Sequence, residues 1–382
     1  MSNRSFTRKL VDFIVLPVVT GLVVAAALMT LFPELRNMSE RLENLGDIGV
    51  DPVAIRYSDP ISYAQAVKRA APSVVNIYTR TIPRQNNHPL LNHPLFRSLY
   101  EQQQQRGLGS LGSGVIMNTQ GFIVTSYHIV GNVDEILVLL YDGRVVPATI
   151  VGTDPETDLA VLKITSDKLQ GITLGNPNQI QIGDVVLAIG NPFGMGQTVT
   201  QGIVSATRRY GLNLNTFENY IQTDADINPG NSGGALIDAY GNLLGINSAK
   251  INRNDSEGIG FAVPVDEVQK VLGDIIQHGR VVRGWLGFQA TQLTPRISRD
   301  LQFKISNGLF ITGIDKGGPA HIAGILPGDI VIAINNTPVT NAQKSINQIA
   351  DIVPGQPVEL QLQRNNESYR VTATAGSRPS VN

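Results

Sequence analysis

The most informative stretch of this sequence is Ile227-Asn228-Pro229-Gly230-Asn231-Ser232-Gly233-Gly234-Ala235-Leu236. A serine hydroxyl becomes an effective nucleophile only when a base removes its proton and backbone N–H groups stabilise the oxyanion that forms on attack. Glycines beside Ser232 allow the close backbone approach that such a site needs. The stretch therefore predicts an oxyanion hole made by the N–H groups of Gly230 and Ser232. A polar turn between two strands is the alternative, because Gly, Asn and Ser dominate turns.

A catalytic serine needs a base, and His128 is the best placed of the five histidines. It follows a predicted hairpin over residues 113–125, so it stands where a strand ends and a rigid sheet can aim its ring. A histidine satisfied by local hydrogen bonds is the alternative interpretation. The other four have adequate structural roles in a polar loop, at a helix end or in a Gly/Pro-rich stretch; they are His88, His93, His278 and His321.

The third member of such a site is a carboxylate that orients the imidazole. Asp158 leads into the apolar strand predicted at 159–164, where an acid is costly to bury unless a partner meets it. Three other acids are better explained by turns or loop ordering, namely Asp142, Asp154 and Asp224. The order His128, Asp158, Ser232 along the chain is that of double β-barrel serine proteases rather than of subtilisins or α/β hydrolases.

These motifs resemble the HtrA family of serine proteases from about residue 60 almost to the end of the chain. The resemblance is carried by Thr125-Ser126-Tyr127-His128-Ile129-Val130, by 157–163 and 230–234, and by 188–194, 199–205 and 258–264. The family more often has small or amide residues where Ser126 and Tyr127 stand, a difference that bears on the cleft wall and not on the triad. The resemblance implies a peptide substrate, an acyl-enzyme mechanism, and neither cofactor nor metal.

Composition agrees with a chain of more than one β-rich domain. Its 382 residues are 42% hydrophobic, which is enough to bury two cores, and 38 glycines punctuate many short Val/Ile/Leu runs. The net charge of −1 gives no reason to propose nucleic acid as a partner. Cysteine is absent, which excludes disulfides, thiol catalysis and cysteine-ligated zinc.

The amino terminus predicts a membrane anchor. Arg4, Arg8 and Lys9 precede Phe13–Phe32, twenty uncharged residues that as a helix would span roughly 30 Å. The positive-inside rule then leaves the amino terminus in the cytoplasm and the rest of the chain across the membrane. Ala25-Ala26-Ala27 offers a signal-peptidase site as the alternative, but the apolar run continues past it, so we expect an uncleaved anchor.

The expected fold is mainly β: a chymotrypsin-like double β-barrel protease domain, then one PDZ domain, with a transmembrane helix before them. We expect five segments, with bounds at 1–33 (cytoplasmic tip and anchor), 34–58 (linker), 59–279 (protease), 280–376 (PDZ) and 377–382 (tail). The helix predicted over Pro264–Gly279, with acids in its first turn and glycine at its end, would connect the two domains.

The resemblance also implies residues around the triad. A side-chain pocket beside the serine is expected to include Leu244, Ile246 and Asn247, a stretch without charge that suits a small apolar side chain before the scissile bond. Arg209 is expected to be a regulatory arginine that contacts the loop before the nucleophile and switches the oxyanion hole on. Its alternative role is that of a solvated surface charge.

In the expected PDZ domain, the segment Trp285-Leu286-Gly287-Phe288 resembles the loop that binds a terminal carboxylate. A turn there offers N–H groups to a chain terminus, while the peptide adds as a strand to the sheet edge. Core packing is the alternative role for Trp285.

One anchor, one protease and one PDZ domain resemble the membrane-anchored bacterial branch of the HtrA family. This implies a homotrimer on the periplasmic face of the inner membrane that is activated by exposed carboxyl termini of misfolded outer-membrane proteins. It also implies cleavage of a membrane-spanning anti-sigma factor in an envelope stress response. Two alternatives stay open: a signal-cleaved degradative protease and chaperone, and a non-enzymatic PDZ scaffold.

Overall fold

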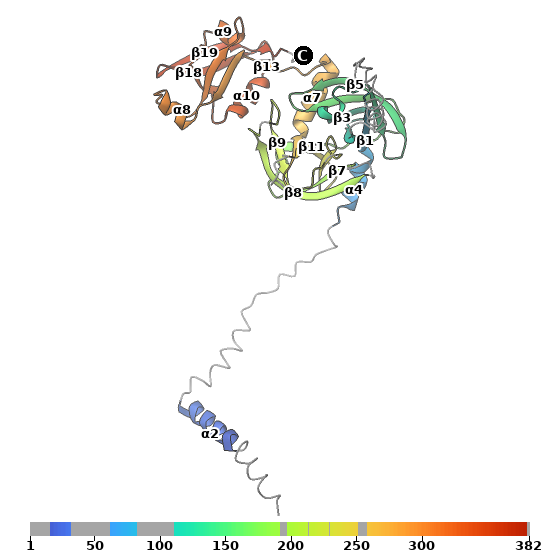
Figure 1. Cartoon of the computed structure of the whole chain (residues 1–382), viewed down its shortest axis with the longest axis vertical. Helices are drawn as coiled ribbons and strands as arrows, with labels where there is room; N and C mark the ends of the chain where they lie inside the picture. The colour runs from blue at the N-terminus through green and yellow to red at the C-terminus, as the bar shows by residue number, and fades with distance from the viewer. Residues whose placement is uncertain are drawn as a thin grey trace, which may run out of the picture. The chain divides into compact units, whose positions relative to one another are not determined.

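A computed structural model describes residues 16–31, 62–81, 111–191, 197–212, 214–228, 230–250 and 258–379 (Figure 1). The chain divides into two units, Met1–Ile61 and Ser62–Asn382. In the first unit the described part is helix α2 (Leu16–Leu31). Among the described residues, no helix has both the length and the hydropathy to span a bilayer. The ends of the predicted span and the predicted linker 34–58 lie outside the described residues.

Six antiparallel strands close the first barrel of the second unit, in the order β1-β2-β3-β6-β5-β4. Alternating β-branched residues send one face of each strand inward, so that Val75, Ile77, Ile116 and Ile123 form a core with no more than 1% exposure. The chain enters through α4 (Ala64–Ala70) and the short 3₁₀ helix η2 (Ala71–Ser73). The strands are β1 (Val74–Arg80), β2 (Leu111–Ile116), β3 (Phe122–Ser126), β4 (Glu135–Leu139), β5 (Val145–Asp154) and β6 (Leu159–Ile164).

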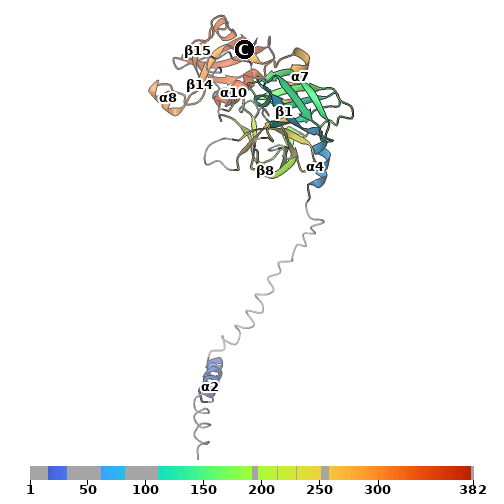
Figure 2. The ribbon, with the colours of Figure 1, turned by 45° about the vertical axis from the view of Figure 1, so that its right-hand side comes forward.

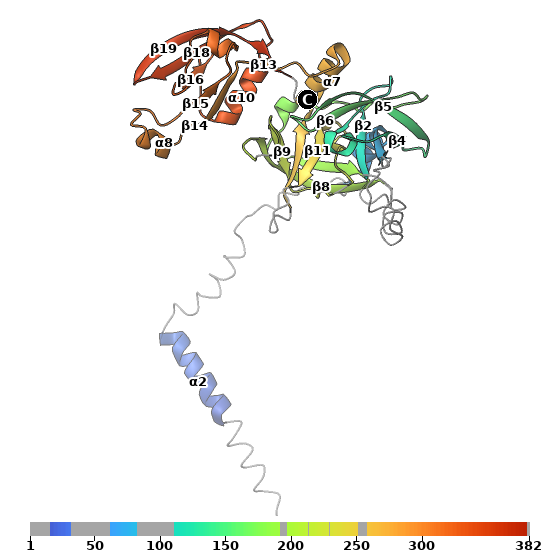
Figure 3. The same ribbon diagram turned by 45° about the horizontal axis from the view of Figure 1, so that its top comes forward.

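A second closed barrel lies beside the first, in the order β10-β11-β12-β9-β8-β7 (Figures 1 and 3). One hydrophobic cluster contains residues of both barrels, among them Val115 and Leu159 from the first and Ile189 and Phe261 from the second. This shared core fixes the two barrels against each other. The strands are β7 (Val185–Gly190), β8 (Thr198–Arg209), β9 (Tyr220–Thr223), β10 (Ala235–Asp238), β11 (Leu243–Lys250) and β12 (Gly260–Pro264), and the 3₁₀ helix η4 (Pro177–Gln179) precedes them.

Helix α7 (Val265–His278) leaves the second barrel where a helix was predicted. Asp266 and Glu267 lie in its first turn and favour the positive end of the helix dipole. Gly279 ends it in the left-handed conformation, with φ 73°. Its buried residues, Val265, Val268, Val271 and Ile275, belong to the core that the two barrels share.

The remaining described residues form a six-stranded sheet, a two-stranded sheet of β13 and β20, and three short helices, as expected for a PDZ domain. The sheet order is β14-β15-β16-β18-β19, so β14 is an edge strand, and α10 lies near it (Figures 2 and 3). The strands are β13 (Gly284–Trp285), β14 (Phe288–Gln292), β15 (Leu309–Ile314), β16 (Ile330–Ile334), β17 (Thr337–Pro338), β18 (Pro357–Arg364), β19 (Glu367–Thr374) and β20 (Gly376–Ser377). The helices are α8 (Pro295–Asp300), α9 (Pro319–Ile322) and α10 (Ala342–Ala350).

An ion pair with a buried carboxylate, that of Asp329, lies beside β16. Asp329 is 1% exposed and accepts the backbone N–H of Leu326 at 2.8 Å. Arg364 at the end of β18 donates to both carboxylate oxygens, from Nε at 2.6 Å and from Nη2 at 2.7 Å. Arg364 is 33% exposed, so the cost of removing the Asp329 carboxylate comes mainly from the hydrogen bonds that this buried group accepts.

The first prediction concerns this pair. Asp329→Ala is expected to lower the free energy of unfolding of the PDZ domain by about 2 kcal/mol, because the hydrogen bonds that the buried carboxylate accepts from Arg364 and from the N–H of Leu326 are lost. Urea unfolding followed by the fluorescence of Trp285, the single tryptophan of the chain, measures this domain specifically.

The matched control is Asp300→Ala, which removes an exposed carboxylate 3.9 Å from Arg296 in the same domain. A surface pair of that kind contributes about 0.5 kcal/mol or less. Equal midpoints for the two variants would contradict the structural role of Asp329.

Candidate active site

His128 lies in a single helical turn, α6 (Tyr127–Val130), that directly follows β3. The preceding strand is held on both sides by β2 and β6, so the backbone that carries the ring is rigid. Ile129 and Val130 are buried in the first barrel, which turns the His128 side chain outward, and it is 50% exposed. The ring is therefore presented to solvent from a fixed base.

Asp158 lies beside this turn and forms three hydrogen bonds with it. Its Oδ2 lies 2.7 Å from Nδ1 of His128, and its Oδ1 accepts the backbone N–H of His128 at 2.9 Å. Its carbonyl accepts the N–H of Tyr127 at 3.0 Å. A carboxylate can only accept, so Nδ1 carries the proton and the lone pair of Nε2 is left for another group.

Asp158 adopts a conformation that sequence reasoning missed. Its φ is 60°, in the left-handed region that non-glycine residues rarely adopt. The carbonyl bond to Tyr127 and the two carboxylate bonds to His128 hold it there. Ser248 of β11 also donates to Oδ2, at 3.4 Å, so the second barrel reaches the same carboxylate. No motif in the sequence points to Ser248.

The loop that carries Ser232 is held by its own asparagines. Asn231 is 3% exposed, and its Oδ1 accepts the N–H of Asn228 at 3.0 Å while its Nδ2 donates to the carbonyl of Asp226 at 3.0 Å. Gly230 and Gly233 have φ values of 104° and 78°, which only glycine adopts readily. The predicted need for glycine on both sides of the serine is therefore explained by backbone conformation.

This loop also lies directly against the first barrel. The N–H of Ser113 on β2 donates to the carbonyl of Ser232 at 2.9 Å. A Cβ placed on Gly233 would lie 2.2 Å from the carbonyl oxygen of Ser113 and 3.0 Å from the N atom of Ser126. Because Ser126 is two residues before His128, Ser232 is fastened close to the histidine.

In the part of the chain that the structure describes, no hydrogen bond joins the Ser232 hydroxyl to the His128 ring. The histidine–carboxylate pair is formed and the serine loop is docked beside it. Hydrogen bonds of this kind are often long in the absence of substrate and shorten when it binds.

The three residues expected around the specificity pocket have clear structural environments. Leu244 and Ile246 are 4% and 0% exposed and lie in hydrophobic clusters of the second barrel. Asn247 exchanges main-chain hydrogen bonds with the serine loop, accepting from Gly233 at 2.7 Å and donating to Gly234 at 2.9 Å. Asn247 therefore positions the loop, and contact of these three with substrate stays a prediction.

Arg209 ends β8 and donates from Nε to Oε1 of Gln222 at 2.8 Å. Gln222 belongs to the neighbouring strand β9, so the guanidinium lies along the barrel surface. Pro229, in the segment that Arg209 was expected to contact, lies outside the described residues. The switching role of Arg209 stays a prediction.

The expected carboxylate loop borders a pocket of about 320 Å³. Its walls come from residues 284–290, from Ile346, Ile349 and Ala350 of α10, and from Thr216 and Phe217 of the protease domain. The carbonyls of Leu286 and Gly287 accept hydrogen bonds from Ala320 and Asp315, at 2.7 and 2.9 Å. Leu286 is 2% exposed and part of the core, whereas Trp285 and Phe288 are partly buried beside the pocket.

Two arginines of the PDZ region contact the turn that leads to Asp158. Arg283 is 5% exposed and binds both carboxylate oxygens of Asp154, from Nη1 at 2.8 Å. Arg378 binds Glu156 from Nε at 2.9 Å. Both guanidinium groups stack on the ring of Phe217, with their Cζ atoms 4.4 and 5.3 Å from its centroid.

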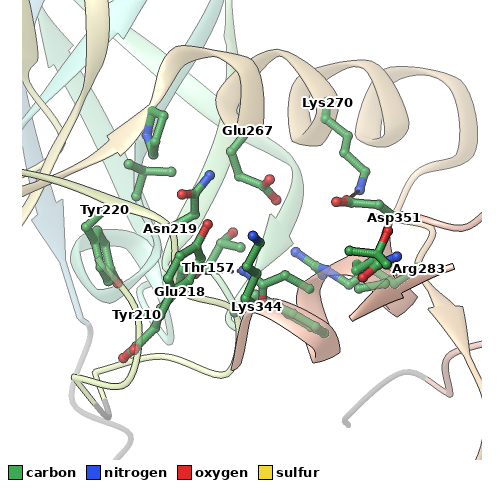
Figure 4. A pocket seen from close by; sticks show the side chains of 17 residues that line it. Thr157, Tyr210, Glu218, Asn219, Tyr220, Glu267, Lys270, Arg283, Lys344 and Asp351 are labelled. Atoms are coloured by element: carbon green, nitrogen blue, oxygen red, sulfur yellow. Dashed lines mark hydrogen bonds and ion pairs between the residues drawn. The ribbon is translucent and has the colours of Figure 1, made fainter. Parts of the chain in front are cut away.

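A second pocket, of about 300 Å³, lies between the second barrel and α10 (Figure 4). Burial raises the pKa of the Glu267 carboxyl, which points into this pocket from α7. Lys270 pairs with Asp351 at its edge. Asn347 of α10 donates to the carbonyl of Glu218 at 2.7 Å, so the loop before β9 is tied to the PDZ domain.

Two family models match the chain. Residues 112–246 match the trypsin-like peptidase domain, and residues 310–364 match the PDZ domain. The first range includes Ser232, His128 and Asp158. The second covers most of the sheet of the carboxyl-terminal domain.

Curated relatives match over nearly the whole chain. The serine endoprotease DegS of Salmonella typhimurium is 38% identical over 376 residues, which cover 96% of this chain and 98% of the relative. DegS of Haemophilus influenzae is 39% identical over 310 residues, covering 80% and 85% of the two chains.

Solved structures give the same result. The HtrA-type protease AlgW with a decapeptide is 46% identical, with a TM-score of 0.73, and the match covers 84% of this chain and all of that one. A serine endoprotease from Yersinia pestis is 39% identical, with a TM-score of 0.63 and the same coverage. With two closed barrels, a PDZ domain and relatives at this identity over 80% or more of its length, the chain belongs to the HtrA family of trypsin-like serine endoproteases.

Proposed function

We propose that this protein is a membrane-anchored periplasmic serine endopeptidase that senses exposed carboxyl termini of misfolded outer-membrane proteins through its PDZ domain. It cleaves a membrane-bound anti-sigma factor and so takes part in the envelope stress response. The observation that carries the catalytic part is the pairing of His128 with Asp158 beside the docked loop of Ser232.

In this mechanism Nε2 of His128 takes the proton from Ser232 as the hydroxyl attacks the peptide carbonyl, and returns it to the leaving amine. Asp158 fixes the tautomer through Nδ1 and stabilises the imidazolium that forms. The N–H groups of Gly230 and Ser232 stabilise the oxyanion. Water then hydrolyses the acyl-enzyme with the same base.

The activating peptide adds as a strand to the free edge of β14, with its carboxylate at the loop Trp285-Leu286-Gly287-Phe288. The N–H groups of Leu286 and Gly287 donate to no backbone acceptor in the described residues, which leaves them available to that carboxylate. The known complex of AlgW with a decapeptide supports a peptide ligand for this chain. Thr216 and Phe217 line the same pocket, so a bound peptide also meets the protease domain.

Control of the protease by peptide follows from this pocket, because both domains contribute residues to its walls. Phe217 lies under Arg283 and Arg378, and those arginines hold the turn before Asp158. A peptide that moves Phe217 therefore favours one arrangement of the protease domain over another, which is the requirement for allosteric control. Arg209 switches the oxyanion loop in this scheme, and the active assembly is a homotrimer.

The second prediction tests the triad. With a saturating hydrophobic decapeptide bearing a free carboxyl terminus, a fluorophosphonate probe should label wild-type protein at Ser232. Asp158→Asn should lower kcat for a peptide substrate by about 10⁴-fold, because the imidazole loses its tautomer and its counter-charge.

The control for that variant is Asp142→Asn, which changes an exposed turn carboxylate bound to Arg144 and should leave kcat unchanged. Wild-type protein that stays unlabelled in the presence of peptide would instead favour a PDZ scaffold without protease activity.

The third prediction tests the carboxylate loop. Gly287 has φ 75°, and a Cβ there would lie 3.0 Å from the Trp285 ring. Gly287→Ala should therefore weaken binding of the free-carboxyl decapeptide at least tenfold, measured by Trp285 fluorescence. Gly273→Ala on α7 is the matched control, since its added Cβ has no described atom within 4 Å apart from the backbone of its own helix and its chain neighbours. An unchanged Kd for Gly287→Ala would place the peptide elsewhere.

The fourth prediction tests the anchor. The full chain expressed in bacteria should remain in the membrane fraction after alkaline carbonate washing, and its amino terminus should be the residue at which translation begins. A soluble mature chain that starts near Leu28 would favour the signal-cleaved protease instead.

A further inference from the structure

Ser113 lies in the middle of β2 with no exposed surface. Its neighbours along the strand are Gly112 and Gly114, and a Cβ on Gly112 would lie 2.4 Å from the Ile129 side chain. β2 is therefore packed tightly against the turn that carries His128. The side chain of Ser113 faces the second barrel, where it meets the loop of Ser232.

The N–H, the carbonyl and the hydroxyl of Ser113 all form hydrogen bonds, and their partners lie around the candidate site. Its N–H donates to the carbonyl of Ser232 at 2.9 Å, and its carbonyl accepts the Thr125 hydroxyl at 2.6 Å. Its hydroxyl donates to the carbonyl of Gly230 at 2.7 Å and accepts the N–H of Asn191 at 3.0 Å. A single buried serine thus joins β3, the end of β7 and the serine loop.

The bond to Gly230 fixes one particular peptide plane. The Gly230–Asn231 peptide lies between the two peptides that supply the proposed oxyanion N–H groups, those of Gly230 and Ser232. Its carbonyl is bonded to Ser113, and its N–H donates to the carbonyl of Asn228 at 3.1 Å. With both ends held, this plane cannot rotate without breaking a buried hydrogen bond, which is costly.

Gly230 makes this restraint necessary. Its φ of 104° lies where glycine is free to move to other conformations at little cost. If this plane rotates, the carbonyl of Gly230 leaves the Ser113 hydroxyl and the N–H of Asn231 leaves its acceptor. The torsion angles that join the plane to its two flanking peptides then change, and with them the relative directions of the Gly230 and Ser232 N–H groups. The N–H of Asn191 polarises the hydroxyl and strengthens the bond it donates.

We propose that Ser113 is a positioning residue for the oxyanion hole: its hydroxyl holds the Gly230–Asn231 peptide so that the flanking N–H groups point at the reacting carbonyl. Ser113 touches neither substrate nor His128. The proposal rests on Ser232 being the nucleophile. It goes beyond that assignment because it names the residue that fixes the conformation of the Ser232 loop.

The test compares Ser113→Ala with Ser73→Ala. Ser73 is also fully buried, and its hydroxyl has no partner among the residues that the structure describes. The measurements use the full chain with the free-carboxyl decapeptide. Ser113→Ala should lower kcat by about 10- to 100-fold with KM changed less than about threefold, and weaken a peptide boronate inhibitor by the same factor, because both need the oxyanion hole. Ser73→Ala should leave all three values unchanged.

Two further readouts separate positioning from a general loss of structure. The pH midpoint of kcat/KM should stay at the wild-type value in Ser113→Ala, because the bond between His128 and Asp158 is untouched. Ser113→Thr restores a hydroxyl and should recover most of the lost kcat. Ser113→Cys is used if the alanine variant folds poorly, because a thiol is similar in size to a hydroxyl and is a weaker hydrogen-bond donor. Its kcat should lie between the values of Ser113→Ala and wild type.

Wild-type kcat for Ser113→Ala, an equal loss in Ser73→Ala, a shifted pH midpoint or no recovery by threonine would each overturn the proposal. Fluorophosphonate labelling of wild-type Ser232 is measured in parallel and reports on the nucleophile itself. Failure of that assignment is thus distinguished from failure of Ser113 to position the loop.

Discussion

The close contact between the loop of Ser232 and the first barrel is the constraint on which the candidate site depends. Gly233 lies so near the carbonyl of Ser113 and the N atom of Ser126 that a side chain there would overlap both. His128 lies in the turn α6 that follows Ser126, and Asp158 is hydrogen bonded to His128. Backbone contacts therefore hold the loop of Ser232 against the first barrel, while Asp158 holds His128.

The bonds to Asp158 explain why a half-exposed histidine can still be well placed. The side chain of His128 is 50% exposed, but its peptide N–H, its Nδ1 and the N–H of Tyr127 all bind Asp158. Asp158 in turn occupies a left-handed conformation that such bonds must stabilise. Order at this site comes from the carboxylate, and the open face of the ring remains accessible to a peptide substrate.

The PDZ domain is joined to the protease at the two places where control of the site would be most direct. Arg283 and Arg378 bind the turn before Asp158, and α10 binds the loop before β9 through Asn347. Phe217 links the two contacts, since it lies under both arginines and lines the pocket of the carboxylate loop. Packed groups therefore connect the walls of that pocket with the turn before Asp158.

Much of the architecture could be read from local patterns. Short Val/Ile/Leu runs between turn signals predicted β-barrels, and the order of His128, Asp158 and Ser232 indicated two of them. Acids followed by a terminal glycine predicted α7, because such signals act within a few residues. Environments set by distant residues were less accessible. Leu244 and Ile246 were expected beside a pocket and lie in hydrophobic clusters, and Arg209 is bonded to Gln222 on the next strand.

The sequence by itself determined the fold class, the order of the domains and the choice of His128, Asp158 and Ser232 as candidates, because motif and spacing are properties of a linear chain. Only the tertiary structure decided the bond between His128 and Asp158, the seat of the Ser232 loop and the part played by Ser113. The Ser113 hydroxyl meets a carbonyl 117 residues away in the chain, and contacts over such separations exist only once both barrels have closed.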